Sequence, residues 1–207
     1  MSHFTALLFI VTGSVFAQSE TSVVSVEELR NPLKGDSMRA IVTAQKHLKS
    51  GQHDRGMQEL REALSDPVAM PYAISFLGME HLRAGQLDAA IAELEQAVRL
   101  LPGPENHSNL AYALGRKGQT ERGLEEVRKA MQLDGGKPKT RMVLGMLLLQ
   151  QGSHDEEAVQ QLQAAAQETP GAHLVLAKHY DLVGQTPDAE RERRAYSVTS
   201  MGLLAAK

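Results

Sequence analysis

The chain of 207 residues contains no cysteine and no tryptophan, and it has only four tyrosines and four phenylalanines. Without cysteine it cannot form a disulfide, a thiolate metal site or a lipid anchor on a cysteine. With so few aromatic side chains, its core must be built from Leu, Ala, Val and Met, which suits closely packed helices. The formal net charge of -3 provides no general attraction to nucleic acid or to anionic membranes, so we expect no nucleic-acid partner.

Sequence patterns that mark common catalytic sites are missing as well. The chain has no Walker loop and no HExxH, GxSxG or SxxK pattern. Among the eight histidines, His47 and His53 are six residues apart, as are His173 and His179, so on a helix the members of each pair would face different sides. We therefore expect no catalytic residue, no bound metal and no cofactor.

What the sequence does contain is a turn that recurs along its length. The segments that carry it begin at five glycines, Gly51, Gly85, Gly118, Gly152 and Gly184, which are 34, 33, 34 and 32 residues apart. An acidic residue follows each turn, where the exposed amides of a starting helix favour negative charge. A constant period of this length predicts an array of stacked repeats.

Residues 71–103, PYAISFLGMEHLRAGQLDAAIAELEQAVRLLPG, show one repeat most clearly. Apolar residues recur at helical spacing before Gly85 and again after it, which predicts two amphipathic helices joined by a short turn. Gly78 and Ala90 have almost no side chain, so the two helices can approach closely there. A single hairpin of this kind cannot bury its own apolar stripe and needs neighbours.

These features resemble the tetratricopeptide repeat family over roughly residues 37–200. The small residue of the family's first helix corresponds to Ala44, Gly78, Ala111, Gly145 and Ala177, and the alanine late in its second helix corresponds to Ala63, Ala97, Ala130 and Ala165. The fifth copy departs from the pattern, with Arg193 and Tyr196 where an apolar residue and Ala are usual, which is typical of a capping repeat.

The resemblance implies an all-α fold, an α-α superhelix (solenoid) of about five helix-turn-helix repeats, with no strand. The solenoid is expected over residues 37–201, followed by a tail at 202–207 that folds back or marks a self-association surface. The expected repeats cover residues 37–70, 71–103, 104–137, 138–171 and 172–201. The expected helices cover residues 37–50, 53–65, 70–84, 87–100, 104–117, 120–133, 138–151, 155–168, 172–183 and 187–201.

The N-terminal residues 1–17 form an apolar run that is too short to span a membrane. The run ends with Val15, Phe16 and Ala17, which is the shape of a secretory cleavage site before Gln18. We interpret residues 1–17 as a signal peptide and predict export to a bacterial periplasm or the medium, with no membrane span after cleavage. The alternative is an N-terminal strand or buried helix of a soluble protein. Residues 18–36 are predicted to be a flexible leader, whose valines and Leu33 could dock on the first repeat.

The family resemblance implies that the first helices of the repeats line a concave face that binds an extended peptide or a partner helix. Methionine adapts its shape and tyrosine combines apolar area with a hydrogen bond, so both suit peptide binding. The alternative for any one of these residues is packing between repeats. The expected partner-binding residues are Tyr72, Phe76, Met79, Arg83, Asn109, Tyr112, Arg116, Lys139, Met142 and Met146.

The expected function is therefore that of a non-catalytic scaffold or adaptor that is exported and binds a protein or peptide in its concave groove. The alternative is a structural module of a cell-envelope assembly that associates with itself through its C-terminal helix. Under that alternative the protein would be a homo-oligomer.

Overall fold

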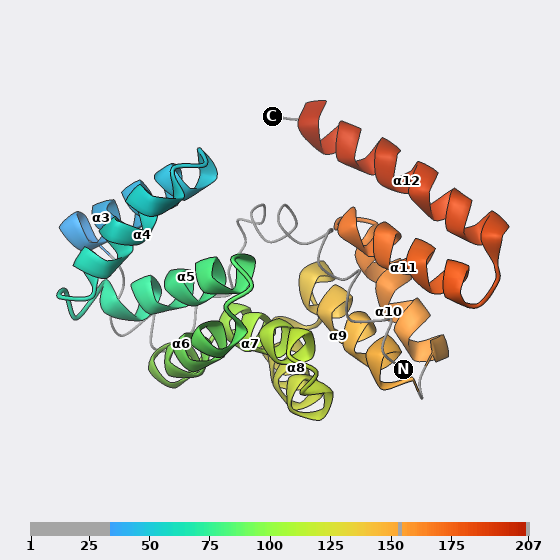
Figure 1. Cartoon of the computed structure of the whole chain (residues 1–207), viewed down its shortest axis with the longest axis horizontal. Coiled ribbons are helices and arrows are strands. Elements are labelled where there is room, and N and C mark those ends of the chain that lie inside the picture. Colours follow the sequence, from blue (N-terminus) through green and yellow to red (C-terminus); the bar gives the residue numbers. More distant parts are fainter. Residues whose placement is uncertain (1–33, 153–154, 206–207) are drawn as a thin grey trace.

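The described residues of the computed structural model, 34–152 and 155–205, form ten α-helices and no strand, arranged as a curved array (Figure 1). The predicted all-α solenoid is thus confirmed. In chain order the helices are α3 (Gly35–Lys49), α4 (His53–Ala63), α5 (Met70–Arg83), α6 (Leu87–Leu100), α7 (Pro104–Arg116), α8 (Thr120–Asp134), α9 (Pro138–Gln151), α10 (Asp155–Ala166), α11 (Gly171–Leu182) and α12 (Thr186–Ala205).

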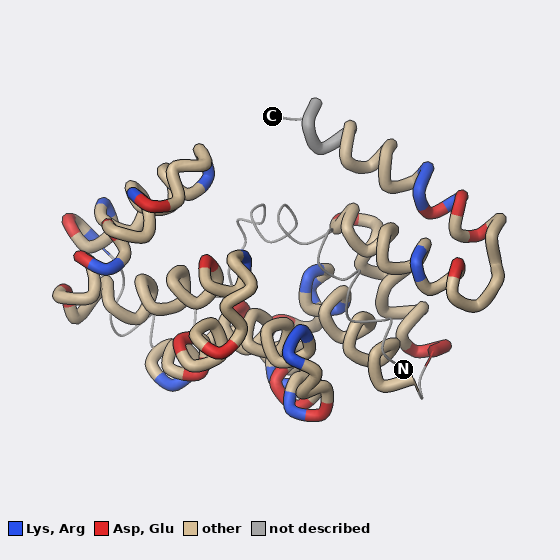
Figure 2. Tube along the Cα trace, viewed as in Figure 1, with Lys and Arg blue, Asp and Glu red and all other residues tan. Residues whose placement is uncertain are grey.

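Consecutive helices pair into five hairpins, and each hairpin packs against the next. The first helices α5, α7 and α9 lie on the inner side of the curve, whereas the second helices α6 and α8 lie on its outer side (Figure 1). Charged residues gather on α6 and α8, while α5 and α9 carry few (Figure 2). The outer layer of second helices is therefore richer in charged residues than the inner layer of first helices (Figure 2).

The recurring turn glycines all adopt the left-handed conformation that ends the first helix of a hairpin. Gly85 has φ 78° and Gly118 has φ 83°, and the other three turns have values between 75° and 80°. A residue with a Cβ is disfavoured there, which explains why glycine recurs at this place. The glycine spacing that predicted the repeats therefore has a direct backbone cause.

Small residues let the two helices of a hairpin touch. A Cβ added at Gly78 would lie 2.8 Å from Cγ of Leu94, and one added at Gly145 would lie 2.6 Å from Cγ of Leu162. Leu94 and Leu162 are completely buried. Each of these leucines of the second helix fills the space that a side chain at the glycine would occupy. This packing is the reason for the small residue in each copy.

The buried apolar residues form two clusters. The N-terminal cluster joins α3, α4 and the first part of α5, and its members are Ile41, Ala44, Leu60, Ala63, Ala69, Ala73 and Leu77. The central cluster extends from Leu82 at the end of α5 to Ala189 in α12. The array thus has a small core in its first hairpin and one continuous core through the rest.

Both ends of the array carry polar residues where the interior copies carry apolar ones. Thr43 is exposed, whereas Leu77 and Leu110, which stand one and two repeats later, are 4% exposed. At the other end, Glu190 is exposed at the position that Ile91 and Leu124 occupy in earlier copies. Polar outer faces are what terminal units of a repeat array need for solubility.

Two boundaries differ from expectation. α3 begins at Gly35, inside the predicted leader, and α12 continues to Ala205, so residues 202–205 extend the helix instead of folding back as a tail. The expected signal peptide (residues 1–17) and most of the leader lie outside the described residues. Within the described residues, none of the helices has both the length and the apolar character needed to cross a membrane.

Candidate protein-interaction surface

The candidate surface is the stripe of each first helix that faces away from its own second helix. Gly78 marks the side of α5 that touches α6. At about 100° per residue, Tyr72, Phe76 and Arg83 lie about 120°, 160° and 140° around the helix from that point. Because Gly78 touches α6, which lies on the outer side of the curve, these three residues face away from that side (Figure 1). We call the corresponding residues of α3, α5, α7 and α9 the inner stripe.

Hydrogen bonds between consecutive first helices hold the inner stripe together. The Ser75 hydroxyl donates to Oδ1 of Asn106 at 2.5 Å, and Nη1 of Arg116 donates to the carbonyl of Leu82 at 2.9 Å, both joining α5 to α7. Nε2 of Gln150 donates to the carbonyl of Gly115 at 3.0 Å and joins α9 to α7. These bonds fix how far one first helix stands from the next.

Six of the ten expected binding residues are accessible in the structure. Arg83 is exposed, and the other five are half-buried, namely Tyr72, Phe76, Met79, Asn109 and Lys139. Tyr72 and Phe76 pack one side against the N-terminal cluster and leave the other side open. They combine apolar area with a fixed position, as a peptide-binding wall requires.

The other four are buried. Tyr112 is 3% exposed, Arg116 6%, Met142 1% and Met146 4%, and the tyrosine and both methionines belong to the central cluster. The guanidinium carbon of Arg116 lies 6.0 Å from the centre of the Tyr112 ring. For these four residues, packing between repeats describes the structure better than direct contact with a partner.

The burial of the central stripe has a local cause in Gly115. A Cβ at Gly115 would lie only 2.4 Å from Cδ2 of Leu147, so α9 packs directly onto α7 at this glycine. The corresponding residue of α5 is Leu82, one repeat earlier. A leucine at that position keeps the next first helix at a greater distance.

Lys139 is a cation of the inner stripe whose pKa is perturbed. Burial lowers its pKa from the ordinary lysine value, and the negative charge of Glu105 on α7 opposes this shift. Lys139 thus lies half-buried at the start of α9, with the carboxylate of Glu105 acting on it from α7.

Sequence reasoning missed Val42 on α3. Val42 is 54% exposed and Met38 on the same helix is 45% exposed. Val42 stands one repeat of 34 residues before Phe76, so aligning the first copy with the second would have found it. Met38 and Val42 on α3 and Tyr72, Phe76 and Met79 on α5 are all at least partly accessible, and we call these five residues the apolar band.

Histidine–glutamate pairs join the two helices of four hairpins away from the inner stripe. In each pair, Nδ1 of the histidine lies 2.6–2.7 Å from a glutamate oxygen; the pairs are His47–Glu59, His81–Glu93, His107–Glu126 and His173–Glu192. The fourth hairpin has Arg141 bonded to Gln161 instead. These contacts give His47, His81, His107 and His173 a structural role, and no group of side chains in the described residues could hold a metal ion.

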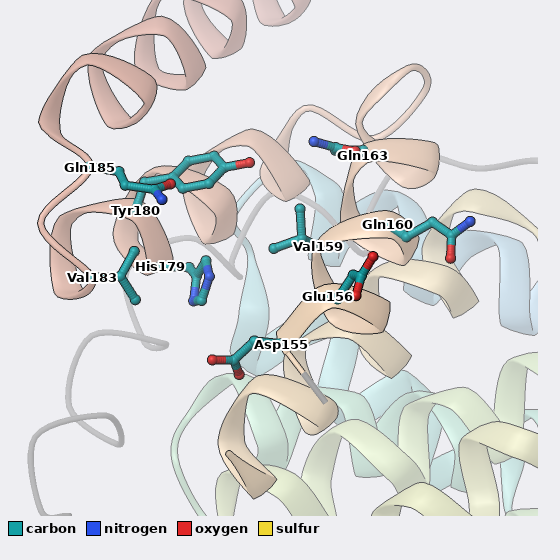
Figure 3. A pocket seen from close by; sticks show the side chains of 9 residues that line it. All are labelled: Asp155, Glu156, Val159, Gln160, Gln163, His179, Tyr180, Val183 and Gln185. Carbon is teal, nitrogen blue, oxygen red and sulfur yellow. The ribbon is translucent and has the colours of Figure 1, made fainter. Parts of the chain in front are cut away.

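An open pocket of about 580 Å³ lies between α10 and α11 (Figure 3). Asp155 and Glu156 come from the first turn of α10, where acidic residues compensate the helix dipole. His179 points toward it from α11 (Figure 3). The other lining residues are Val159, Gln160, Gln163, Tyr180, Val183 and Gln185. No nucleophile with a base beside it lines the pocket, so we assign no reaction to it.

Comparison with known proteins agrees with this geometry. The family model for the tetratricopeptide repeat matches residues 77–138 and 108–173. Residues 77–173 of the chain thus consist of tetratricopeptide repeats. The matched residues include every helix from α6 to α10, and the structure extends the same repeat to both sides.

Solved tetratricopeptide repeat structures share the fold. PilW, a widely conserved type IV pilus biogenesis factor, superposes with a TM-score of 0.70 at 19% identity, covering 81% of this chain and 79% of PilW. The protein TTC0263 of Thermus thermophilus gives 0.66 at 18% identity, covering 80% and 99%. MamA of Desulfovibrio magneticus RS-1 gives 0.60 at 14% identity, covering 81% and 97%. None of the curated proteins compared with the chain matches it significantly.

Proposed function

We propose that the protein is a non-catalytic, exported adaptor that binds a peptide or protein partner on the inner side of its repeat array. The observation that carries the proposal is the apolar band, which remains accessible within an array whose outer layer is polar. Met38 and Val42 on α3 are 45% and 54% exposed, and the aromatic side chains of Tyr72 and Phe76 on the next first helix are half-buried. Clustered apolar area rimmed by polar residues is typical of an interaction site.

Cations at the edge of the band indicate what else the partner carries. Lys49 on α3 and Arg83 on α5 are both exposed and occupy equivalent positions one repeat apart. An extended or helical segment with apolar side chains flanked by carboxylates fits this arrangement, because the apolar side chains would cover the band and the carboxylates would meet the cations.

A matched pair of variants tests the site. Met38→Asp with Val42→Asp places charge on the band at exposed positions, so it should abolish partner capture from the native cell envelope without changing helicity. Leu133→Asp is the control, since Leu133 is similarly exposed (47%) but lies on the second helix α8. Equal capture by both variants would show that the apolar band is not the binding site.

Export is part of the proposal and rests on the apolar residues 1–17 and the small residues before Gln18. The similarity of the fold to PilW, whose role is type IV pilus biogenesis, supports a place in a cell-envelope assembly. The intact mass of the protein isolated from its native host tests export. A mature chain that begins at Gln18 is expected, and retention of residues 1–17 would contradict it.

A second candidate function is self-association through the C-terminal helix. Val198 and Met201, three residues apart on α12, are 73% and 68% exposed. They form the start of an apolar stripe that no described residue covers. Light scattering over a wide concentration range tests this candidate: Met201→Asp should lower the mean mass if α12 mediates association, and a constant monomer mass of the unmodified chain would exclude it.

A further inference from the structure

We propose that the chain's own residues 18–33 occupy the apolar band and compete with the partner, so that the adaptor is autoinhibited. This inference rests on the proposed function, since it assigns an internal regulator to the same surface. Three observations carry it: the composition of residues 18–33, the charge beside the band, and the distance that this length of chain can reach.

The composition of residues 18–33 complements the band. Val23, Val24 and Val26 form an apolar cluster that is followed at once by Glu27 and Glu28. With Glu20 the segment has three carboxylates against the single cation Arg30, a net charge of 3 − 1 = 2 negative units. The valines match an apolar surface and the glutamates match cations beside it.

The charge at the edge of the band is of the opposite sign. Lys49 stands in the last turn of α3 and Arg83 in the last turn of α5, both exposed and both on the inner stripe. Oppositely charged groups at a partly shielded surface attract each other and fix the direction in which a segment lies. Arg83 is already paired with Glu80 of α5, which accepts from Nε and Nη2 of Arg83, so Lys49 is the main cation that the glutamates next to the valines would meet.

The reach of the segment fits the same placement. The described chain starts at Lys34, directly before α3, whose 15 residues make it about 22 Å long at 1.5 Å per residue. Seven extended residues cover about 23 Å, so the segment is long enough to bring Glu27 to the end of α3, where Lys49 lies. The valines lie further along the segment and can cross the spacing of about 10 Å between packed helices to Phe76 on α5.

Tethering makes even a weak contact effective. A segment joined directly to α3 acts at an effective concentration on the order of millimolar. If the segment alone bound the band with a dissociation constant of about 0.1 mM, the tether would weaken partner binding about tenfold. Partner binding would then require displacement of residues 18–33, which regulates the adaptor without any change of fold.

Disulfide trapping tests the placement in the full chain, which has no native cysteine to interfere. One variant carries Val24→Cys with Val42→Cys on the band. Its control carries Val24→Cys with Thr43→Cys, because Thr43 is exposed and adjacent in sequence but faces the outer end of the array. The first pair should oxidise at least about tenfold faster, and Glu27→Lys with Glu28→Lys should reduce that preference. Equal oxidation rates of the two pairs would overturn the proposal.

A capture assay with the same chain separates the two proposals. Val24→Asp with Val26→Asp should raise partner capture about tenfold if residues 18–33 compete with the partner. If trapping favours Val42 but Met38→Asp with Val42→Asp leaves capture intact, the segment contact stands and the adaptor site is refuted. If that band variant abolishes capture but trapping shows no preference, the adaptor site stands and autoinhibition is refuted.

Discussion

The helices α3, α5, α7 and α9 are all first helices of the same repeat, yet α3 and α5 present a different surface from α7 and α9. On α3 the inner-stripe residue Val42 is 54% exposed, whereas Val143, at the same repeat position of α9, is buried, as are the stripe residues Tyr112 and Met146. At Gly115 α9 packs directly onto α7, whereas leucines, Leu82 and Leu48, stand at the same position of α5 and α3. The close approach at Gly115 thus contributes to covering the inner stripe between α7 and α9.

The same division appears in the cores. The N-terminal cluster is confined to the first hairpin and the start of α5, and the central cluster runs through all later hairpins. In a repeat array, stability is the sum of the repeats and of the interfaces between neighbours. We therefore expect the first hairpin to open at a lower free energy than the rest of the chain.

Core truncation should show the largest effect. Leu60 and Leu148 are 0% and 1% exposed, and each substitution to Ala should cost about 2–5 kcal/mol in its own cluster. Leu148→Ala should lower the free energy of global unfolding, measured in denaturant. Leu60→Ala should mainly accelerate hydrogen exchange in α3 and α4. Identical exchange profiles for the two variants would mean that the clusters unfold as one unit.

Gly115→Ala should break the closed half of the stripe. The new methyl group would meet Leu147, so the substitution should destabilise the central cluster by about 1–3 kcal/mol. Leu147→Ala removes the obstructing side chain, so the double variant should be more stable than the sum of the two single effects predicts. Additive effects in denaturant unfolding would show that Gly115 does not control the approach of α9 to α7.

Acid should weaken both halves through different carboxylates. For Glu126, burial disfavours the charge, but hydrogen bonds from Lys129 and His107 outweigh it and lower its pKa. For Asp66, the hydrogen bond from Ser37 and the amide of Val68 lower the pKa. A lowered folded pKa contributes stability above the unfolded value of about 4, and that stability is lost as the pH falls through the folded value.

Replacing each of these carboxylates by its amide tests its role in the acid response of its own half of the molecule. These variants should have the smallest effects of those described. In the Glu126→Gln variant, the free energy of global unfolding should decrease less between about pH 5 and pH 3. This is the pH range in which ordinary carboxylates become protonated. Asp66→Asn should flatten only the acid-induced exchange of the first hairpin, because Asp66 ties α3 to the start of α5. Unchanged pH profiles in both variants would contradict the assigned roles of these carboxylates.

The repeat pattern in the sequence was sufficient to predict the helices and their turns. Every turn needs a residue in the left-handed conformation, which glycine adopts most readily. The fixed spacing of the glycines therefore locates the hairpins. The expected helix bounds agree with the structure to within a few residues except at α12, which continues to Ala205. Residues 201–205 contain no proline and only one glycine, Gly202, so the sequence gives no clear signal for where α12 ends.

Accessibility along the inner stripe could not be predicted in the same way. Tyr112, Met142 and Met146 have the composition of a binding wall, but whether they are covered depends on how close α9 comes to α7. That distance is a tertiary property set by the contact of Gly115 with Leu147. A Tyr or Met side chain can either pack between repeats or contact a partner, and its neighbours in space decide whether it is buried.

The central claim is that the inner stripe is accessible on α3 and α5, whereas its central residues on α7 and α9, such as Tyr112, Val143 and Met146, are covered. Thiol labelling of single-cysteine variants tests it most directly, because the chain has no cysteine of its own. Val42→Cys and Phe76→Cys should react readily, whereas Met146→Cys should react at least about a hundredfold more slowly, since its thiol becomes reachable only when the repeat opens. Labelling of Met146→Cys as fast as that of Val42→Cys would contradict the claim.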